Sequence, residues 1–162
     1  MSNPLELSID TSTRYASVAI SVCGKVSVSL TWHSNRNHSV ELVPAIQEVL
    51  GRVHGTIADL SAVFVAKGPG GFSALRVGIS FAKSLADSRD IPLIAIPTLD
   101  VESYPFLGIG NPVCSVIKAG KTKVYAGKYD LNKGVDGHPD VEYGVFKPTD
   151  LLDSLHVRTL IC

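Results

Sequence analysis

The chain has few cysteines, the residues that cross-link small disulfide-rich domains. Its 162 residues include three cysteines, one methionine and one tryptophan. The cysteines, Cys23, Cys114 and Cys162, are odd in number and far apart, so neither a disulfide framework nor a zinc motif is predicted. We expect three buried free thiols in a reducing compartment.

The chain also lacks an excess of charge and a long apolar run. Fifteen basic residues balance fifteen acidic residues, and 45% of the chain is hydrophobic. A protein that binds nucleic acid by itself usually has a basic surplus, so RNA contact here would need a local patch or a partner. No stretch is long enough to span a bilayer, and the first residues do not form a signal peptide. The sequence therefore predicts a cytoplasmic globular protein without membrane association.

Apolar periodicity predicts an α/β protein over the first hundred residues. The first three strands are joined by short turns, which is typical of an antiparallel meander. The order of elements is βββαβαβα. The expected elements are strands at 5–10, 17–22 and 26–32, a helix at 40–52, a strand at 62–66, a helix at 72–88, a strand at 93–96 and a helix at 99–106.

A segment rich in Gly, Asn and Pro at 108–112 predicts a domain boundary. Residues 1–108 would form a first lobe and residues 109–162 an incomplete second lobe. The expected second-lobe elements are strands at 113–117, 124–129, 143–146 and 159–162 and a helix at 148–155, with loops at 132–134 and 136–137. Because no helix follows the last apolar strand, we expect a second lobe that is truncated or naturally short.

The most informative segment is 66–84, where an apolar strand enters a glycine-rich loop and then a helix. Gly68, Gly70 and Gly71 would let backbone N–H groups converge at the helix N-terminus, where an anion can bind. The pattern is neither Walker A nor Gly-x-Gly-x-x-Gly. A tight turn that starts the helix is the favoured interpretation, with phosphate binding as the alternative.

The helix after this loop carries small residues on one face. Ala74, Gly78 and Ala82 are four residues apart, and Leu75 lies beside them. Packing against the sheet would explain this spacing. Apolar residues on more than one helix face, however, indicate that another subunit covers part of the helix.

Several motifs together resemble the TsaB (YeaZ) family. These are bacterial partner proteins in threonylcarbamoyladenosine tRNA modification, also labelled glycoprotease-like. The resemblance implies the actin-like ATPase (ribonuclease H-like) fold, with a βββαβα first lobe and here a partial second lobe. The motifs are Ile9-Asp10-Thr11-Ser12-Thr13, His38-Ser39 before Leu42-Val43-Pro44, Gly68-Pro69-Gly70-Gly71-Phe72-Ser73, Leu75-Arg76-Val77-Gly78, Pro97-Thr98-Leu99-Asp100 and Lys123-Val124-Tyr125.

The resemblance implies a non-catalytic scaffold subunit. Such a subunit would form a homodimer through its first-lobe helices and would activate the catalytic paralogue TsaD, which holds the metal. It would work with the ATPase TsaE, and would meet tRNA through the complex rather than alone. The expected interface residues are His38, Leu42, Ile46, Ala74, Leu75, Gly78 and Ala82.

An ATP-binding ATPase or phosphotransferase of the same fold is the alternative. In active members of the superfamily, a carboxylate at the position of Asp10 helps to organise the metal of the nucleotide. Lys118 stands where the family commonly has an acidic residue; it could contact phosphate but could not hold a metal, which argues against autonomous hydrolysis. ATP or ADP would then bind at a partner interface. The candidate nucleotide-binding residues are Asp10, Thr11, Ser12, Thr13, Gly68, Gly70 and Gly71.

A glycoprotease-like metallopeptidase is a second alternative. His33 and His38 are five residues apart, a spacing that does not place two ligands on one helix face. Ser12, Ser73 and Cys114 lie outside any Gly-x-Ser-x-Gly sequence. The sequence therefore predicts no catalytic set, no metal site and no firmly bound cofactor.

Overall fold

The computed structural model of the chain describes residues 4–135, 138–156 and 158–162. They form two compact units, which divide after Ile96. This division lies ahead of the segment at 108–112 where the sequence indicates a boundary, because the helix that begins at Thr98 packs on the second sheet. The hydroxyl of Ser115 in that sheet donates a hydrogen bond of 2.9 Å to the carbonyl oxygen of Leu99. A lobe boundary at residue 108 stays a prediction.

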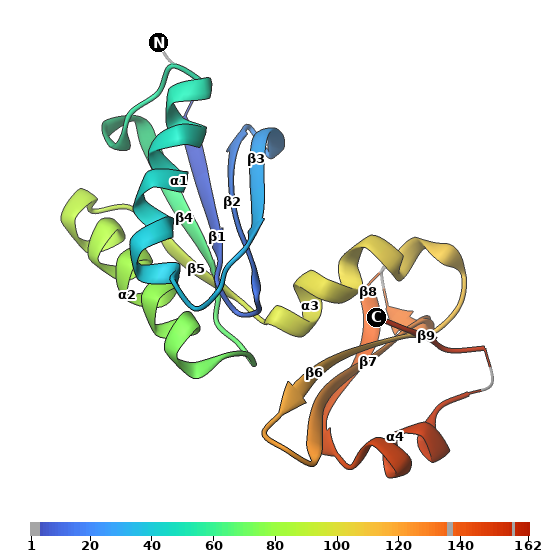
Figure 1. The fold of residues 1–162 in the computed structure, drawn as a ribbon. Helices are drawn as coiled ribbons and strands as arrows, with labels where there is room; N and C mark the ends of the chain where they lie inside the picture. The colour runs from blue at the N-terminus through green and yellow to red at the C-terminus, as the bar shows by residue number, and fades with distance from the viewer. Residues whose placement is uncertain (1–3, 136–137, 157) are drawn as a thin grey trace. The chain divides into compact units, whose positions relative to one another are not determined.

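The first unit is a five-stranded sheet with two helices on one face (Figure 1). Its elements are β1 (Leu5–Asp10), β2 (Tyr15–Val22), β3 (Lys25–His33), α1 (His38–Arg52), the 3-10 helix η1 (Ile57–Asp59), β4 (Leu60–Ala66), α2 (Phe72–Arg89) and β5 (Leu93–Ile96). The strand order is β3-β2-β1-β4-β5. The first three strands are antiparallel neighbours, and β4 and β5 run parallel to β1.

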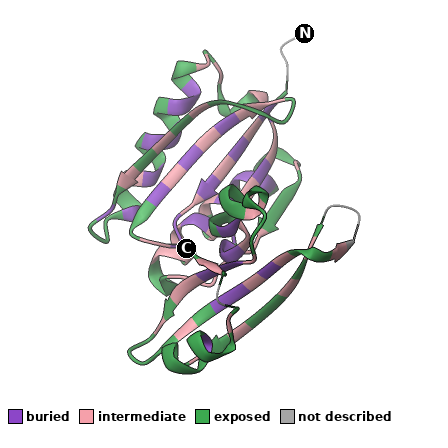
Figure 2. Ribbon diagram, turned by 90° about the vertical axis from the view of Figure 1, so that its right-hand side faces the viewer, coloured by how far each residue is buried: buried purple, intermediate pink, exposed green. Residues whose placement is uncertain are grey.

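Alternation along the strands builds the core of this unit. Leu7 of β1 pairs with Ile20 of β2 and Val63 of β4, and all three side chains are fully buried. Val49 of α1 and Ala82 of α2 join the same apolar cluster. Figure 2 shows the result as alternating bands along the sheet. The predicted βββαβα order of the first lobe is confirmed.

The second unit is a four-stranded sheet in the order β8-β7-β6-β9. Its elements are α3 (Thr98–Ser103), the 3-10 helix η2 (Tyr104–Ile109), β6 (Val113–Ala119), β7 (Lys123–Val135), β8 (His138–Phe146), α4 (Pro148–Ser154) and β9 (Leu160–Ile161). Leu99 of α3 packs with buried residues of one face of this sheet. Leu151 of α4 packs with buried residues of the other face.

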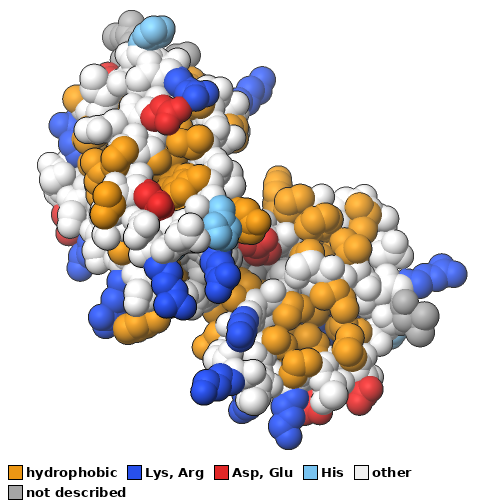
Figure 3. Space-filling view, in the orientation of Figure 1, with side chains coloured by type: hydrophobic (Ala, Val, Ile, Leu, Met, Phe, Trp, Pro, Cys, Tyr) orange, Lys and Arg blue, Asp and Glu red, His pale blue; other side chains and the backbone are white. Residues whose placement is uncertain are grey.

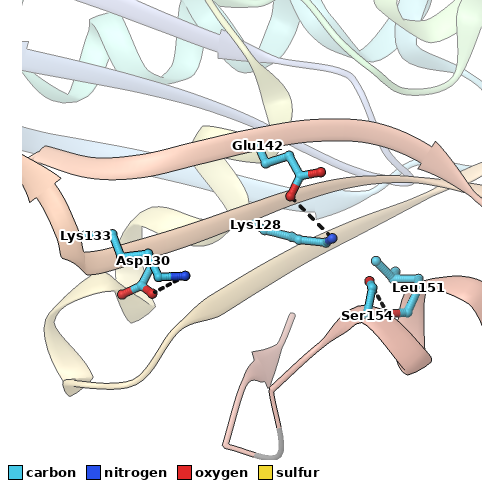
Figure 4. Close-up of polar contacts among 6 residues, drawn as sticks. All are labelled: Lys128, Asp130, Lys133, Glu142, Leu151 and Ser154. Atoms are coloured by element: carbon cyan, nitrogen blue, oxygen red, sulfur yellow. Dashed lines mark hydrogen bonds and ion pairs between the residues drawn. The ribbon is translucent and has the colours of Figure 1, made fainter.

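Two lysines of β7 form ion pairs inside this unit (Figure 4). The ammonium nitrogen of Lys128 lies 3.4 Å from a carboxylate oxygen of Glu142 on β8. That of Lys133 lies 3.6 Å from a carboxylate oxygen of Asp130 on the same strand. Lys128 and Lys133 are thus each neutralised by a neighbouring carboxylate.

Three sequence-based expectations differ from the structure. The first helix begins at His38 rather than Val40, so part of the polar segment before it is helical. The loop expected at 132–134 lies within β7, between the pairs Asp130–Asp140 and Val135–His138, where the register with β8 is irregular. The helix expected at 99–106 is divided into α3 and η2, with Pro105 in the first turn of η2. The loop expected at 136–137 lies outside the described residues.

The cysteines are free, but they are not all buried. Cys23 is exposed in the turn between β2 and β3, where its φ is 51° and that of Gly24 is 74°. The expectation of buried thiols is therefore wrong for Cys23, which lies in a tight turn, and Cys162 is only half-buried. Cys114 is buried, and burial raises the pKa of its thiol. Within the described residues, no helix is long and apolar enough to cross a membrane.

Candidate functional site

The candidate site begins with the turn that follows β1. One carboxylate oxygen of Asp10 accepts hydrogen bonds from the backbone N–H of Ser12 (2.7 Å) and from the Ser12 hydroxyl (2.6 Å). A side chain that bonds the backbone two residues ahead closes the chain into an Asx turn. Thr13 stabilises the following residues of the turn, because its hydroxyl donates a hydrogen bond of 3.1 Å to the carbonyl oxygen of Tyr15. The turn is held by its own side chains.

The glycine-rich loop lies directly against this turn. The backbone N–H of Gly71 donates to the carbonyl oxygen of Ser12 at 2.7 Å. A Cβ at Gly70 would overlap the same carbonyl oxygen, so only glycine permits this approach. Gly68 has a φ of +105°, a conformation that also favours glycine. Gly70 and Gly71 therefore allow the loop backbone to lie against the Ser12 carbonyl oxygen just before α2 begins.

Helix α2 is fixed to the turn by a second contact. The hydroxyl of Thr11 donates to the carbonyl oxygen of Ala74 at 2.7 Å, and Thr11 is buried. One turn further along the helix, a Cβ at Gly78 would overlap the oxygen of the same Thr11 hydroxyl. Gly78 is thus the position at which α2 approaches the end of β1 most closely.

Helix α1 reaches the turn from the other side. A ring nitrogen of the buried His38 lies 3.2 Å from the carbonyl oxygen of Thr13. The indole N–H of Trp32 donates to Glu41 in the first turn of α1 at 2.9 Å. Hydrogen bonds from the Ser34 hydroxyl and from Trp32 lower the pKa of the Glu41 carboxyl. The N-termini of both helices are therefore anchored around residues 11–13.

The structure brings the candidate nucleotide-binding residues together. The turn formed by Asp10, Thr11, Ser12 and Thr13 touches the loop that holds Gly68, Gly70 and Gly71. The hydroxyls of Thr11, Ser12 and Thr13 all donate to partners within the unit. Ser12 also has a carboxylate beside its hydroxyl, but it is only 2% exposed, so a substrate has no access to it. The arrangement positions two helices, and the hydroxyl-bearing residues Thr11 and Ser12 of this turn are buried.

The candidate interface residues have a different placement from the one expected. Most of them are buried within the first unit itself, and Ala74 and Leu75 are half-buried. Leu42 and Ile46 belong to the apolar core, as does Ala82, because the face of each helix on which they lie packs on the sheet. The residues buried in this way are His38, Leu42, Ile46, Gly78 and Ala82.

Other residues form the exposed surface of these two helices. Val40 and Val43 of α1 are 74% and 42% exposed, and Phe72 of α2 is 68% exposed. The guanidinium of Arg76 lies 4.0 Å from the centre of the Phe72 ring. The interface residues expected from the sequence include none of Val40, Val43 and Phe72, because the pattern places Val43 on the apolar stripe of the helix.

No group of three or more His, Cys, Asp or Glu side chains that could hold a metal ion occurs among residues 4–135, 138–156 and 158–162. His33 lies against the ring of Tyr15, with 5.3 Å between ring centres, while His38 is used in the contact with Thr13. Lys118 is exposed near the end of β6.

Comparisons with known proteins agree with this fold. The family model described as TsaD, tRNA N6-adenosine threonylcarbamoyltransferase, matches residues 32–157. The chain is 32% identical over 129 residues to the tRNA threonylcarbamoyladenosine biosynthesis protein TsaB of Bacillus subtilis. That alignment covers 80% of this chain and 56% of the relative. The chain thus spans little more than half the length of this curated relative.

Solved structures agree on the architecture. YeaZ from Pseudomonas aeruginosa superposes with a TM-score of 0.77 at 27% identity, covering 90% of this chain and 68% of the other. An activator of the 2-hydroxyisocaproyl-CoA dehydratase from Clostridium difficile, with bound ADPNP, has the same fold at 13% identity, with a TM-score of 0.51 over 91% of this chain and 46% of the other. The expected actin-like ATPase fold is therefore confirmed. On the matched family model, the relative and the YeaZ structure together, the chain belongs to the TsaB/YeaZ family.

Proposed function

We propose that the chain is a non-catalytic assembly subunit in the biosynthesis of threonylcarbamoyladenosine on tRNA. In this role it would form a homodimer, activate the threonylcarbamoyltransferase TsaD in the cytoplasm, and work alongside the ATPase TsaE. The observation that supports this role concerns the turn after β1. The hydroxyls of Thr11, Ser12 and Thr13 donate hydrogen bonds to other groups of the protein. A site for catalysis would need such groups to face a substrate.

The exposed group on α1 and α2 supports an assembly role. Val40, Val43 and Phe72 are apolar, exposed and carried by two helices whose N-termini are anchored to the same turn. Large exposed apolar side chains that lie together mark interaction sites. The Arg76 guanidinium lies over the Phe72 ring, and such a cation–aromatic pair is strongest when a partner protein covers it. A two-fold homodimer would place this surface against its own copy.

Replacing exposed residues of this surface tests the proposal without disturbing the core. Val43→Glu with Phe72→Glu should abolish self-association in sedimentation, because it introduces four charges into a two-fold contact, and should weaken retention of TsaD. The matched control is Ile57→Glu with Val26→Glu, which changes residues that are 42% and 67% exposed on other elements. Unchanged association and retention in the first variant would refute an interface on these helices.

The nucleotide-binding alternative keeps one favourable observation. The Asp10 turn and the glycine-rich loop are in contact, as a phosphate site of this fold requires. Calorimetry of the isolated chain with magnesium and ATP separates the two functions. Under the assembly proposal, no binding heat is expected. Saturable binding that is lost in Asp10→Ala would favour the ATPase or phosphotransferase instead.

A further inference from the structure

One end of the second sheet carries a group of lysines. Lys118 lies near the end of β6, Lys121 lies in the turn that follows, and Lys123 begins β7. Lys147 directly follows β8. Because Val124 pairs with Phe146, the antiparallel register brings Lys147 to the same end as Lys123. We call these four residues the hairpin lysines; Figure 3 shows basic side chains gathered over this end of the second unit.

The hairpin lysines are not neutralised as the other lysines of this sheet are. All four are exposed, and none has an ion-pair partner within the part of the chain that the structure describes. Lys128 and Lys133, by contrast, each have a carboxylate (Figure 4). Like charges gathered at one end of a sheet repel one another, so an external anion, rather than the fold, would be the partner of this group.

Exposed aromatic and apolar side chains lie beside these lysines. Tyr125 of β7 pairs with Val145 of β8, and both are exposed. Since side chains two apart share a face, Lys123 and Tyr125 point to the same side of the sheet. Lys118 pairs with Val124 and therefore points to the opposite side. Tyr143 continues this face and is also exposed. The acidic residues of α4, Asp150 and Asp153, lie on the helix that packs on the opposite face.

Surfaces that bind single-stranded nucleic acid combine cationic side chains with exposed aromatic rings. Ammonium groups contact the phosphates, and unpaired bases stack on the ring. Because the chain has no net charge, affinity for RNA must come from a local group of this kind. We propose that Lys121, Lys123 and Lys147, with Tyr125, form an RNA-contacting surface that binds an unpaired segment of the tRNA. This inference rests on the proposed function for the identity of the RNA.

The charge of this surface favours RNA over a protein partner. Three unpaired cations complement a polyanion, whereas a second copy of the chain would bring three like charges to the contact. The exposed apolar area beside them consists of a few side chains on a flat sheet face, which suits stacking of bases more than burial of a helix.

The test uses the complex of this chain with TsaD and measures tRNA binding over a range of salt concentrations. Lys121→Ala, Lys123→Ala and Lys147→Ala in one chain should reduce the magnitude of the slope of log K against log salt by about 2, because each phosphate contact to a single strand contributes about 0.7. The control triple, Lys25→Ala, Lys83→Ala and Lys133→Ala, should leave the slope unchanged. An equal slope in the complex carrying the hairpin variant would overturn the proposal.

Two variants test the contribution of the Tyr125 ring to RNA binding. Tyr125→Ala should weaken tRNA binding about five-fold or more, whereas Tyr125→Phe should retain it, because the phenyl ring still stacks. Tyr104→Ala, at another exposed tyrosine of the same unit, is the control. Equal affinities for the Tyr125→Ala and wild-type complexes would contradict a stacking role.

Retention of TsaD by the wild-type chain is measured first and tests the proposed function separately. If TsaD is not retained, the same variants are compared by ultraviolet crosslinking of the isolated chain to tRNA, where the hairpin triple should lose crosslinks. Unchanged crosslinking would overturn the RNA surface. Loss of TsaD retention by the hairpin triple, with unchanged crosslinking of the isolated chain to tRNA, would instead assign these lysines to a protein interface.

Discussion

At the scale of single residues, Gly78 shows how a small side chain can serve the interior. A methyl group at this position would overlap the Thr11 hydroxyl, which donates to Ala74. Overpacking of this kind costs about 1–3 kcal/mol, while Gly→Ala in a helix gains at most about 1 kcal/mol. We therefore expect Gly78→Ala to lower the free energy of unfolding by about 1 kcal/mol, measured by urea denaturation.

Gly51 provides the matched control for this substitution. It lies in α1, and no atom is close to the position of its Cβ. Gly51→Ala should therefore stabilise the protein by about 0.5–1 kcal/mol. Thr11→Ala in the Gly78→Ala background should cost less than the sum of the two single changes, because it removes the overlapping atoms. Strict additivity would show that Gly78 is not constrained by Thr11.

The same residue shows the limit of the sequence. The spacing of Ala74, Gly78 and Ala82 correctly indicates a closely approached helix face, but not what approaches it. The neighbour is Thr11, more than sixty residues away in the chain, and only the position of α2 on β1 reveals it. For this reason Gly78→Leu, an obvious test of an interface, would test folding instead. Exposed Phe72 and Val43 are the better positions for that purpose.

At the scale of elements, one carboxylate of α3 contacts two strands of the second sheet. Asp100 accepts hydrogen bonds from the hydroxyls of Tyr129 on β7, at 2.8 Å, and Tyr143 on β8. Partial burial and this hydrogen bond raise the pKa of Tyr143 to about 12, and the same causes raise the pKa of Tyr129. Both phenols therefore favour the protonated form in the folded state.

This attachment predicts a loss of stability at high pH. The contribution of Tyr143 is complete below pH 10, the ordinary value, and is lost as the pH rises toward 12. In a tyrosinate absorbance titration of the native protein, two of the five tyrosines should ionise after the others. Asp100→Asn should move both to lower pH without restoring ordinary values, since burial remains. Asp153→Asn is the control, and late ionisation that persists unchanged in Asp100→Asn would refute the contact.

Most elements could be predicted because each carries its own periodicity. Strand alternation in Leu5, Leu7 and Ile9 and the apolar stripe of α1 are local patterns, and the structure confirms both. The extension of β7 through residues 132–134 could not be predicted in this way. Asn, Lys and Gly have low strand propensity, and the strand continues through them across an irregularity in its register with β8 between Asp130 and Val135. The meeting of Lys123 and Lys147 is likewise a property of register, which the sequence does not display.

At the scale of the whole molecule, the two units differ in the size of their cores. The first holds one continuous cluster that joins three strands and two helices, with Leu7, Ile20 and Val63 fully buried. The second has two small clusters, one on each side of its sheet, centred on Val113 and on Cys114. Because burial of apolar area is the main stabilising term in folding, the second unit should open more readily than the first.

Native-state hydrogen exchange measures this difference directly. Amides of β6 and β7 should exchange with an opening free energy at least about 2 kcal/mol below that of β1 and β4, roughly the value of one fully buried leucine or isoleucine. Gly78→Ala, which acts on the first unit, should reduce protection in β1 and β4 and leave β6 and β7 unchanged. Equal protection of both sheets, falling together in this variant, would mean that the chain unfolds as one cooperative body. In that case the lysine and interface variants would each have to be checked for effects on both units.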